Sequence, residues 1–153
     1  MLRDVQESDL PIFFEQQCEP EAHRMAGFQP RERDAFMLHW QTKVLGEPTA
    51  RKRTIVVDAC VTGYIGSWSD DGRRLVGYWI GREYWGRGIA TAALSEFARE
   101  ESTRPLYAYV AAHNLGSMRV LQKCGFRQLG DVHLQPDAVG EHCFRLDAPG
   151  AGS

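Results

Sequence analysis

The chain has 153 residues, of which 43% are hydrophobic and 25% are charged, and its formal net charge is −2. This length and composition indicate a single globular domain that buries most of its apolar surface. The small net charge gives no electrostatic case for binding nucleic acid or an anionic membrane surface. No signal peptide and no apolar run near the length of a membrane span is evident. The four cysteines are far apart and form no C-x-x-C pair, so a cytoplasmic protein with reduced thiols is expected.

The first third of the chain predicts a short strand and two helices. Residues 2–5 are the strand candidate. Ser8 is placed to cap a first helix, whose opening turn tolerates Pro11. From Cys18 to Pro30 the apolar residues lose their helical spacing, and a loop or broken helix is expected. A second helix follows, because apolar side chains recur at helical spacing at Phe36, Met37, Trp40 and Val44.

Strands dominate the middle of the chain. The segments Arg53–Ala59, Thr62–Trp68 and Arg73–Gly81 are rich in residues that favour strands. An Asp-Gly pair at residues 71–72 predicts a hairpin turn between the second and third of these segments. The third segment leads directly into a loop that contains Gly86 and Gly88.

After this loop, helix and strand alternate. A helix is predicted from Ile89 to about Glu101, because Ile89, Ala92, Ala93 and Phe97 share one helical face. Residues 106–110 form the next predicted strand. A short helix is bounded by Asn114 as its N-cap and Gly125 just beyond its end. Residues 126–132 and 141–146 are the last predicted strands, and residues 148–153 are expected to be a flexible tail.

The order of these elements predicts a mixed α/β fold. We expect one domain over residues 1–147, in which helices flank a twisted, mostly antiparallel central sheet. No internal repeat or low-complexity segment interrupts it.

The loop around Gly86 and Gly88 predicts a site for an anion. Glycine tolerates positive φ and lets a ligand approach the main chain, and the first turn of the following helix has N–H groups without partners. A dinucleotide-binding loop would need a third glycine at Thr91 and an acidic residue near Leu106, and neither is present. A P-loop is excluded because no Gly-Lys-Ser or Gly-Lys-Thr occurs.

Residues 77–94 resemble the acetyl-CoA-binding motif of the GNAT superfamily of N-acetyltransferases, most closely the branch of the ribosomal-protein N-terminal acetyltransferases. The family pattern is Gln or Arg, two residues, Gly, one residue, then Gly or Ala. Here it is Trp85-Gly86-Arg87-Gly88-Ile89-Ala90, so Trp85 stands where Gln or Arg is usual. Residues 114–126 resemble the family's second motif. The resemblance covers nearly the whole chain and is weakest from Cys18 to Pro30.

This resemblance implies direct transfer of an acetyl group from acetyl-CoA to a primary amine, on a small molecule or a protein N-terminus. The cofactor would lie where the strands at residues 73–81 and 106–110 diverge. The implied cofactor contacts are Trp79, Ile80, Gly81, Trp85, Gly86, Arg87, Gly88, Ile89, Ala90, Thr91 and Asn114. Met25 and Phe28 are the implied contacts to the acceptor.

The resemblance also implies a catalytic role for Ser117, whose hydroxyl would hydrogen-bond or protonate the leaving thiolate. Leu121 stands where many relatives have a tyrosine acid, and Leu75 stands where relatives often have a glutamate base. No general base is assigned, because an α-amine with a pKa near ~8 is partly neutral at pH 7. A catalytically silent acyl-CoA-binding module of the same fold and a nucleotide-dependent enzyme remain as alternatives. No metal site is expected, and the acceptor and the oligomeric state stay open.

Overall fold

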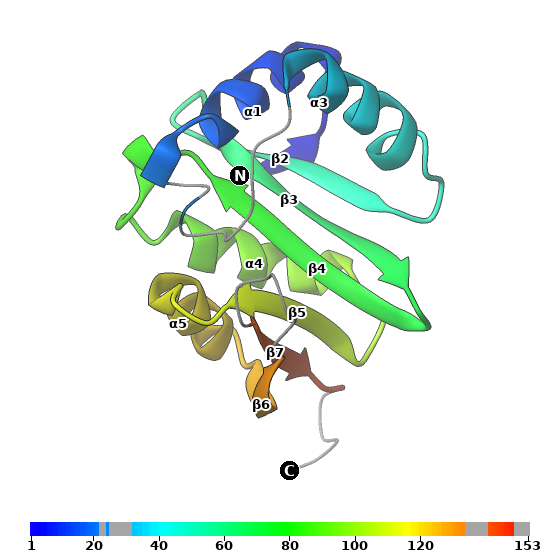
Figure 1. Cartoon of the computed structure of the whole chain (residues 1–153), viewed down its shortest axis with the longest axis vertical. Coiled ribbons are helices and arrows are strands. Elements are labelled where there is room, and N and C mark those ends of the chain that lie inside the picture. The colour runs from blue at the N-terminus through cyan, green and yellow to red at the C-terminus, as the bar shows by residue number, and fades with distance from the viewer. Residues whose placement is uncertain (22–23, 25–31, 134–140, 149–153) are drawn as a thin grey trace.

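The structure is a computed structural model, and it describes residues 1–21, 24, 32–133 and 141–148 (Figure 1). Its centre is a sheet of seven strands in the order β1-β2-β3-β4-β5-β7-β6. The strands are β1 (Leu2–Asp4), β2 (Arg51–Val57), β3 (Cys60–Asp70), β4 (Arg73–Ile80), β5 (Leu106–Ala111), β6 (Arg127–His133) and β7 (Glu141–Leu146). The helices are α1 (Leu10–Gln17), α3 (Arg33–His39), α4 (Ile89–Glu100) and α5 (Leu115–Lys123). The predicted mixed α/β domain with a mostly antiparallel sheet is confirmed.

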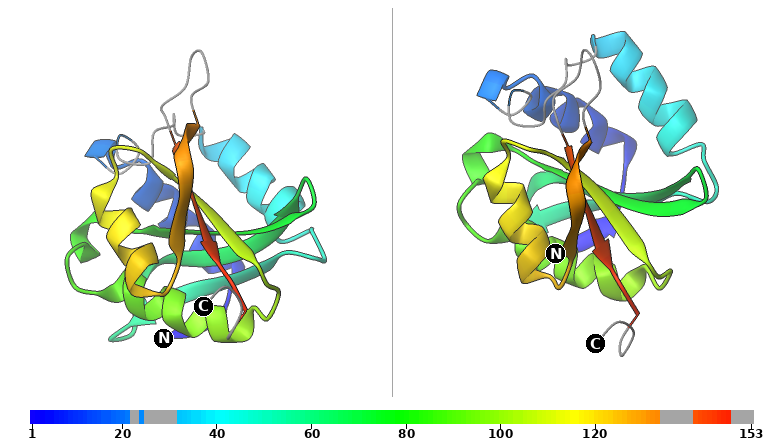
Figure 2. Two further views of the ribbon diagram at one scale, coloured as in Figure 1. Left: turned by 90° about the horizontal axis from the view of Figure 1, so that it is seen from below. Right: turned by 60° about the horizontal axis from the view of Figure 1, so that its bottom comes forward.

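Helices cover both faces of the sheet. Helices α1 and α3 lie on one face of β2–β4 and α4 lies on the other, while α5 lies beside α4 near β5 (Figures 1 and 2). Side chains along β3 alternate between the two faces of the sheet. Tyr64 packs toward α1 and α3, and Ile65 packs toward α4.

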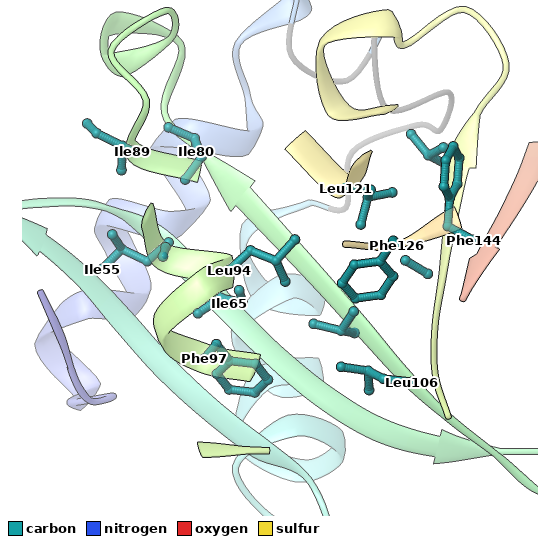
Figure 3. Packing of buried hydrophobic residues seen from close by; sticks show 14 residues of the cluster. Ile55, Ile65, Ile80, Ile89, Leu94, Phe97, Leu106, Leu121, Phe126 and Phe144 are labelled. Carbon is teal, nitrogen blue, oxygen red and sulfur yellow. The ribbon is translucent and has the colours of Figure 1, made fainter. Parts of the chain in front are cut away.

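The larger core lies between the sheet and helices α4 and α5 (Figure 3). Helix α4 contributes its buried stripe, which matches the apolar face predicted from the sequence except that Leu94 joins it and Ala92 does not. The buried members of this core are Ile55, Ile65, Val76, Ile80, Ile89, Ala93, Leu94, Phe97, Leu106, Ala108, Val110, Leu121, Phe126 and Phe144. This core holds the beginning of α4 against the end of β4, where the glycine loop lies.

A smaller core joins α1 and α3 to the opposite face. Its buried members are Leu10, Phe13, Phe36 and Trp40. The ring centroids of Phe13 and Trp40 are 5.1 Å apart, and those of Phe13 and Tyr64 are 4.9 Å apart. Aromatic pairs in this range attract one another beyond their burial of area, so the rings fix α1 and α3 over β3.

The sheet opens between β4 and β5, which are its one parallel pair among the described strands. Strand β4 pairs with β3 along its whole length, from Arg73 to Ile80. It pairs with β5 only at Arg74–Leu106 and Leu75–Tyr107. Beyond Leu75 the two strands diverge, as the family resemblance led us to expect. The edge of β4 from Val76 to Ile80 therefore has no paired residue on β5.

Two expected boundaries were wrong. Ser8 does not cap α1, because a 3-10 turn (Glu7–Asp9) precedes the helix and Gln6 is its N-cap. The carboxylate of Asp9 accepts hydrogen bonds from the Gln6 amide at 2.8 Å and from Arg3 and Thr54, which holds this turn in place.

The other error concerns the turn between β2 and β3. The strand expected to end at Ala59 ends at Val57, because Asp58 and Ala59 adopt φ values of 51° and 65° in a tight turn. Strand β3 consequently begins at Cys60 and continues to Asp70. The second predicted helix also changes character, since α3 ends at His39 and a π-helical turn, η2 (Trp40–Val44), continues it.

Candidate functional site

A cavity of about 460 Å³ opens where β4 ends, between the beginning of α4 and helix α5. Ten of the residues implied as cofactor or catalytic contacts line it. They are Trp79, Ile80, Trp85, Gly86, Gly88, Ile89, Ala90, Thr91, Asn114 and Ser117. Segments that are far apart in the sequence therefore meet at one place.

The glycine loop forms one end of this cavity. Gly86 and Gly88 adopt φ values of 76° and 77°, a region that side chains other than glycine rarely adopt. A Cβ at either position would meet no protein atom within 4 Å, so both glycines border open space. Gly88 is the N-cap of α4 and supplies no side-chain cap. The amides of the first turn, at residues 89–91, are thus available to an anion.

The end of β4 forms a second wall. The amide of Gly81 donates to the carbonyl of Thr62 on β3 at 2.8 Å. Because backbone groups alternate in direction along a strand, the amide of Ile80 points the other way, toward the side on which β5 lies. The carbonyl of Ile80 accepts a hydrogen bond from Trp85 Nε1 at 2.9 Å. Trp85, which departs from the family pattern, therefore ties the glycine loop to the strand.

Helix α5 forms the third wall, and its first turn is fixed by Asn114. The side-chain oxygen of Asn114 accepts a hydrogen bond from the Ser117 amide at 3.2 Å, so the predicted N-cap is confirmed. Gly125 has a φ of 92° just beyond the helix, as expected of a C′ glycine. Asn114 and Gly125 thus fix the two ends of α5, and the Ser117 side chain in its first turn lines the cavity.

Tyr78 is the most informative residue that sequence reasoning missed. Its hydroxyl lies 2.6 Å from Ser117 Oγ, and its ring lines the cavity. Burial raises the pKa of Tyr78 to about 12, although the hydrogen bond with Ser117 lowers it in part. The available signal was its position, because Tyr78 is two residues before Ile80 and therefore lies on the same face of β4.

Two basic residues of α5 were also missed. Arg119 and Lys123 line the cavity together with Gly116 and Val120. Their spacing of four residues places both cations on one face of the helix, which was visible in the sequence. They add positive charge to a cavity that already has helix amides at one end, so the site suits a polyanionic ligand.

Some predicted positions do not line the cavity. Gly81 packs beside Gln16, whose side-chain atoms would lie 3.0 Å from a Cβ at this position. Arg87 is exposed and its guanidinium carbon lies 5.7 Å from the centre of the Tyr84 ring. Met25 and Phe28 lie outside the described residues.

The two leucines that replace acid–base residues of the family are buried. Leu75 is 7% exposed and Leu121 is 1% exposed, and Leu121 belongs to the larger core. Both positions therefore serve packing.

A second cavity of about 540 Å³ lies at the other end of β4 and contains no predicted site residue. Two of its arginines, Arg51 and Arg74, lie 3.7 and 2.9 Å from the carboxylate of Glu101, which neutralises part of their charge. Across the described ranges, no three His, Cys, Asp or Glu side chains gather closely enough to hold a metal ion. Nor does any described helix combine the length and apolar character needed to cross a membrane.

Comparisons with known proteins bear on the family and on the fold. A family model described as an acetyltransferase (GNAT) domain matches residues 1–127. No curated protein sequence matches significantly.

Similar solved structures share the fold. The aminoglycoside acetyltransferase AAC(6')-Ib in complex with coenzyme A and kanamycin is 18% identical, with a TM-score of 0.76 over 94% of this chain and 92% of that one. RimL, a ribosomal alpha-N-protein acetyltransferase in complex with coenzyme A, is also 18% identical, with a TM-score of 0.76 over 95% and 92% of the chains. A GNAT-family acetyltransferase from Bacillus anthracis is 16% identical, with a TM-score of 0.79 over 95% and 93%.

Proposed function

Because the chain belongs to the GNAT acetyltransferase family, we propose that it transfers an acetyl group from acetyl-CoA to a primary amine by direct attack. One observation carries this proposal: a single cavity joins a glycine loop suited to phosphate with the hydroxyl of Ser117, along the open edge of β4.

The proposed binding mode uses main-chain groups. The pyrophosphate of acetyl-CoA binds the amides of residues 86–91, and Arg119 and Lys123 add positive charge beside it. The pantetheine arm runs between β4 and β5 and pairs with the edge of β4 as a further strand would. Asn114 contacts this arm, and Gly81 and Arg87, on either side of the loop, are further contacts to the cofactor in this proposal.

The proposed reaction needs no covalent enzyme intermediate. The amine attacks the thioester carbonyl, and the amide of Ile80 stabilises the charge that develops on the carbonyl oxygen. The C–S bond then breaks with its electron pair on sulfur, and the hydroxyl of Ser117 hydrogen-bonds the leaving thiolate. Leu75 supplies no base, so water accepts the surplus proton of the amine, which is partly neutral at pH 7 if it is an α-amine.

The acceptor is an amine of a small molecule or of a protein N-terminus. Met25 and Phe28, the expected contacts to the acceptor, lie outside the described residues. The two kinds of acceptor follow the similar structures, of which one holds kanamycin and another is a ribosomal alpha-N-protein acetyltransferase. We assign this activity to residues 1–147. Residues 149–153, which belong to the expected tail, lie outside the described residues. The free cysteines at positions 18, 60, 124 and 143 fit a reducing compartment such as the cytoplasm.

Two measurements test the proposal. Isothermal titration with CoA, NAD and ATP is expected to show binding of CoA only, and a preference for either nucleotide would overturn the assignment. Thiol release from acetyl-CoA is then followed with kanamycin, spermidine and N-terminal peptides of ribosomal proteins as acceptors. At least one amine is expected to be acetylated, with the product identified by mass spectrometry.

A catalytically silent acyl-CoA-binding module is the second candidate. It is favoured by one observation, the burial of Leu75 and Leu121 at positions where relatives place acid–base groups. Such a module binds CoA but releases no thiol with any amine of the panel. Turnover therefore separates the two candidates, whereas binding alone does not.

A further inference from the structure

Resting on the proposed function, we propose that Tyr78 is a positioning residue for Ser117: its phenol donates to Ser117 Oγ, which turns the Ser117 proton toward the sulfur of the leaving thiolate. Neither the family pattern nor the sequence analysis assigns a role to Tyr78. The residue comes from the strand, whereas the tyrosine that relatives use would come from the α5 position occupied by Leu121.

Either oxygen could donate in the hydrogen bond between Tyr78 and Ser117, and the proposed direction has the phenol as donor. The Tyr78 oxygen lies 2.6 Å from Ser117 Oγ and 3.4 Å from the Ser117 carbonyl oxygen. A phenol has one proton, and the shorter contact has the better hydrogen-bond length. With the phenol as donor to Ser117 Oγ, the proton of Ser117 is left to be donated into the cavity.

The surrounding structure holds both groups in place. The amide of Ser117 is fixed by Asn114 Oδ1, and the other end of α5 is tied to α4 because Cys124 Sγ lies 3.4 Å from the Thr91 carbonyl oxygen. The ring of Tyr78 packs against the larger core. A hydroxyl aimed by a rigid neighbour stabilises developing charge without reorganising during the reaction.

The chemical step is a hydrogen bond and involves no net proton transfer to Tyr78. When the C–S bond breaks, the electron pair stays on sulfur, Ser117 donates a hydrogen bond to it, and water later supplies the proton of the free thiol. Burial keeps the pKa of Tyr78 at about 12, so the phenol remains a donor throughout the neutral range. Among the described residues, the other titratable groups near this point are Arg119 and Lys123 of α5, Cys124 just beyond its end, and Tyr84 on the glycine-loop side.

The test measures the pKa of the CoA thiol while CoA is bound, from the ultraviolet absorbance of the thiolate. This readout needs no acceptor amine. In Ser117→Ala the bound thiol is expected to have a pKa about one unit or more above that in the wild type, because a hydrogen bond to a charged group is lost. Tyr78→Phe is expected to give most of the same rise, and the double variant no more than Ser117→Ala alone.

Tyr107→Phe is the matched control, since Tyr107 lies on β5 outside this cavity and is expected to leave the thiol pKa unchanged. Phenylalanine keeps the packed ring of residue 78, and circular dichroism checks the fold of each variant. Incorporation of 3,5-difluorotyrosine at position 78 gives a second probe, because the more acidic phenol is expected to lower the thiol pKa. With the amine acceptor found above, Tyr78→Phe is expected to lower kcat more than it changes KM for acetyl-CoA.

The outcomes are distinct. If the wild type fails to bind CoA, the proposed function falls and this inference falls with it. If CoA binds and Tyr78→Phe leaves the thiol pKa at the wild-type value, the inference alone is overturned. Additive shifts in the double variant, or an unchanged thiol pKa in Ser117→Ala, would also overturn it.

Discussion

Lys52 carries a charge into an unusual environment on the face of the sheet that α1 and α3 cover. Its ammonium lies 5.0 Å from the ring centre of Trp68, 5.7 Å from that of Trp40 and 5.9 Å from that of Tyr64. Its aliphatic stem lies over Gly66, where a Cβ would come within 2.3 Å of Lys52 Cδ. Burial lowers the pKa of Lys52 from 10.5 to about 8. Ring faces attract the cation and offset part of the burial cost.

This environment predicts a pH dependence of stability. Below about pH 8 both the folded and the unfolded chain carry the Lys52 proton, so the cost of burying the charge is present in full. Between about pH 8 and 10.5 the folded chain has lost this proton and the unfolded chain has not, so the free energy of unfolding rises with pH. Lys52→Met is expected to remove this rise and to stabilise the protein at pH 7 by about 1–3 kcal/mol.

The measurement is urea unfolding at several pH values across this window. Lys123→Met is the control, because Lys123 is exposed on α5. A wild type and a Lys52→Met variant with parallel pH profiles would contradict the prediction.

Glu101 is a buried carboxylate whose charge stabilises the fold, whereas the charge of Lys52 destabilises it. It accepts hydrogen bonds from Ser67 Oγ at 2.5 Å, from Arg74 Nε at 2.9 Å and from the Thr103 amide at 3.2 Å. Burial by itself would raise the pKa of Glu101, but the bonds from Ser67 and Arg74 outweigh it and lower the pKa to about 2. The carboxylate therefore joins the end of α4 to strands β3 and β4.

Removal of this charge is expected to destabilise the protein. Glu101→Gln removes the carboxylate that pairs with the Arg74 guanidinium and should cost about 3–5 kcal/mol at pH 7. The deficit should shrink as the pH falls from about 4.5 to 2, because the wild type then loses the same charge. Thermal unfolding of wild type, Glu101→Gln and the more exposed neighbour Glu100→Gln measures this. An equal loss of Tm for both variants would argue against a special role for Glu101.

At the scale of elements, the junction of β4 with α4 gives a prediction about affinity. Gly88→Ala forces a side chain into positive φ and places a methyl group where the phosphate is proposed to bind. Gly72→Ala is a matched control, because Gly72 has a φ of 79° and no protein atom within 4 Å of its Cβ, but it lies in the distant β3–β4 turn.

Both variants should lose about 1–2 kcal/mol of stability to the same backbone strain. Only Gly88→Ala should weaken CoA binding, by about tenfold or more, because a loss of about 1.4 kcal/mol of binding free energy lowers the affinity tenfold. Calorimetric titration with CoA compares them. Equal CoA affinities would remove the glycine loop from the proposed binding site.

The sequence predicted most elements because their signals are local. Helix α5 was bounded correctly at Asn114 and Gly125, since capping depends on residues within one turn. Ser8 failed as a cap because Asp9 is held by Arg3 and Thr54, and Thr54 is remote in the sequence. The contact between Tyr78 and Ser117 joins residues 39 positions apart, so only the packed fold brings it into view.

At the scale of the whole molecule, the proposed cofactor should stabilise the native state. A ligand at 100 times its Kd contributes about 2.7 kcal/mol, which corresponds to a Tm increase of roughly 5–11 °C for a domain of this size. Differential scanning fluorimetry with CoA measures the shift, with NAD and ATP at the same concentration as controls. A similar shift with all three would indicate a general anion effect.

The short pairing of β4 with β5 has a mechanical consequence. Strands β1–β4 form one part of the sheet and β5–β7 form the other. Only two residue pairs, both between β4 and β5, join the backbones of these two parts. Elsewhere the two parts of the sheet are held together by packed side chains of the larger core, which separate more easily than a ladder of hydrogen bonds. A pantetheine chain bound between the two parts of the sheet would hold them together, so the enzyme should be most rigid when acetyl-CoA is bound.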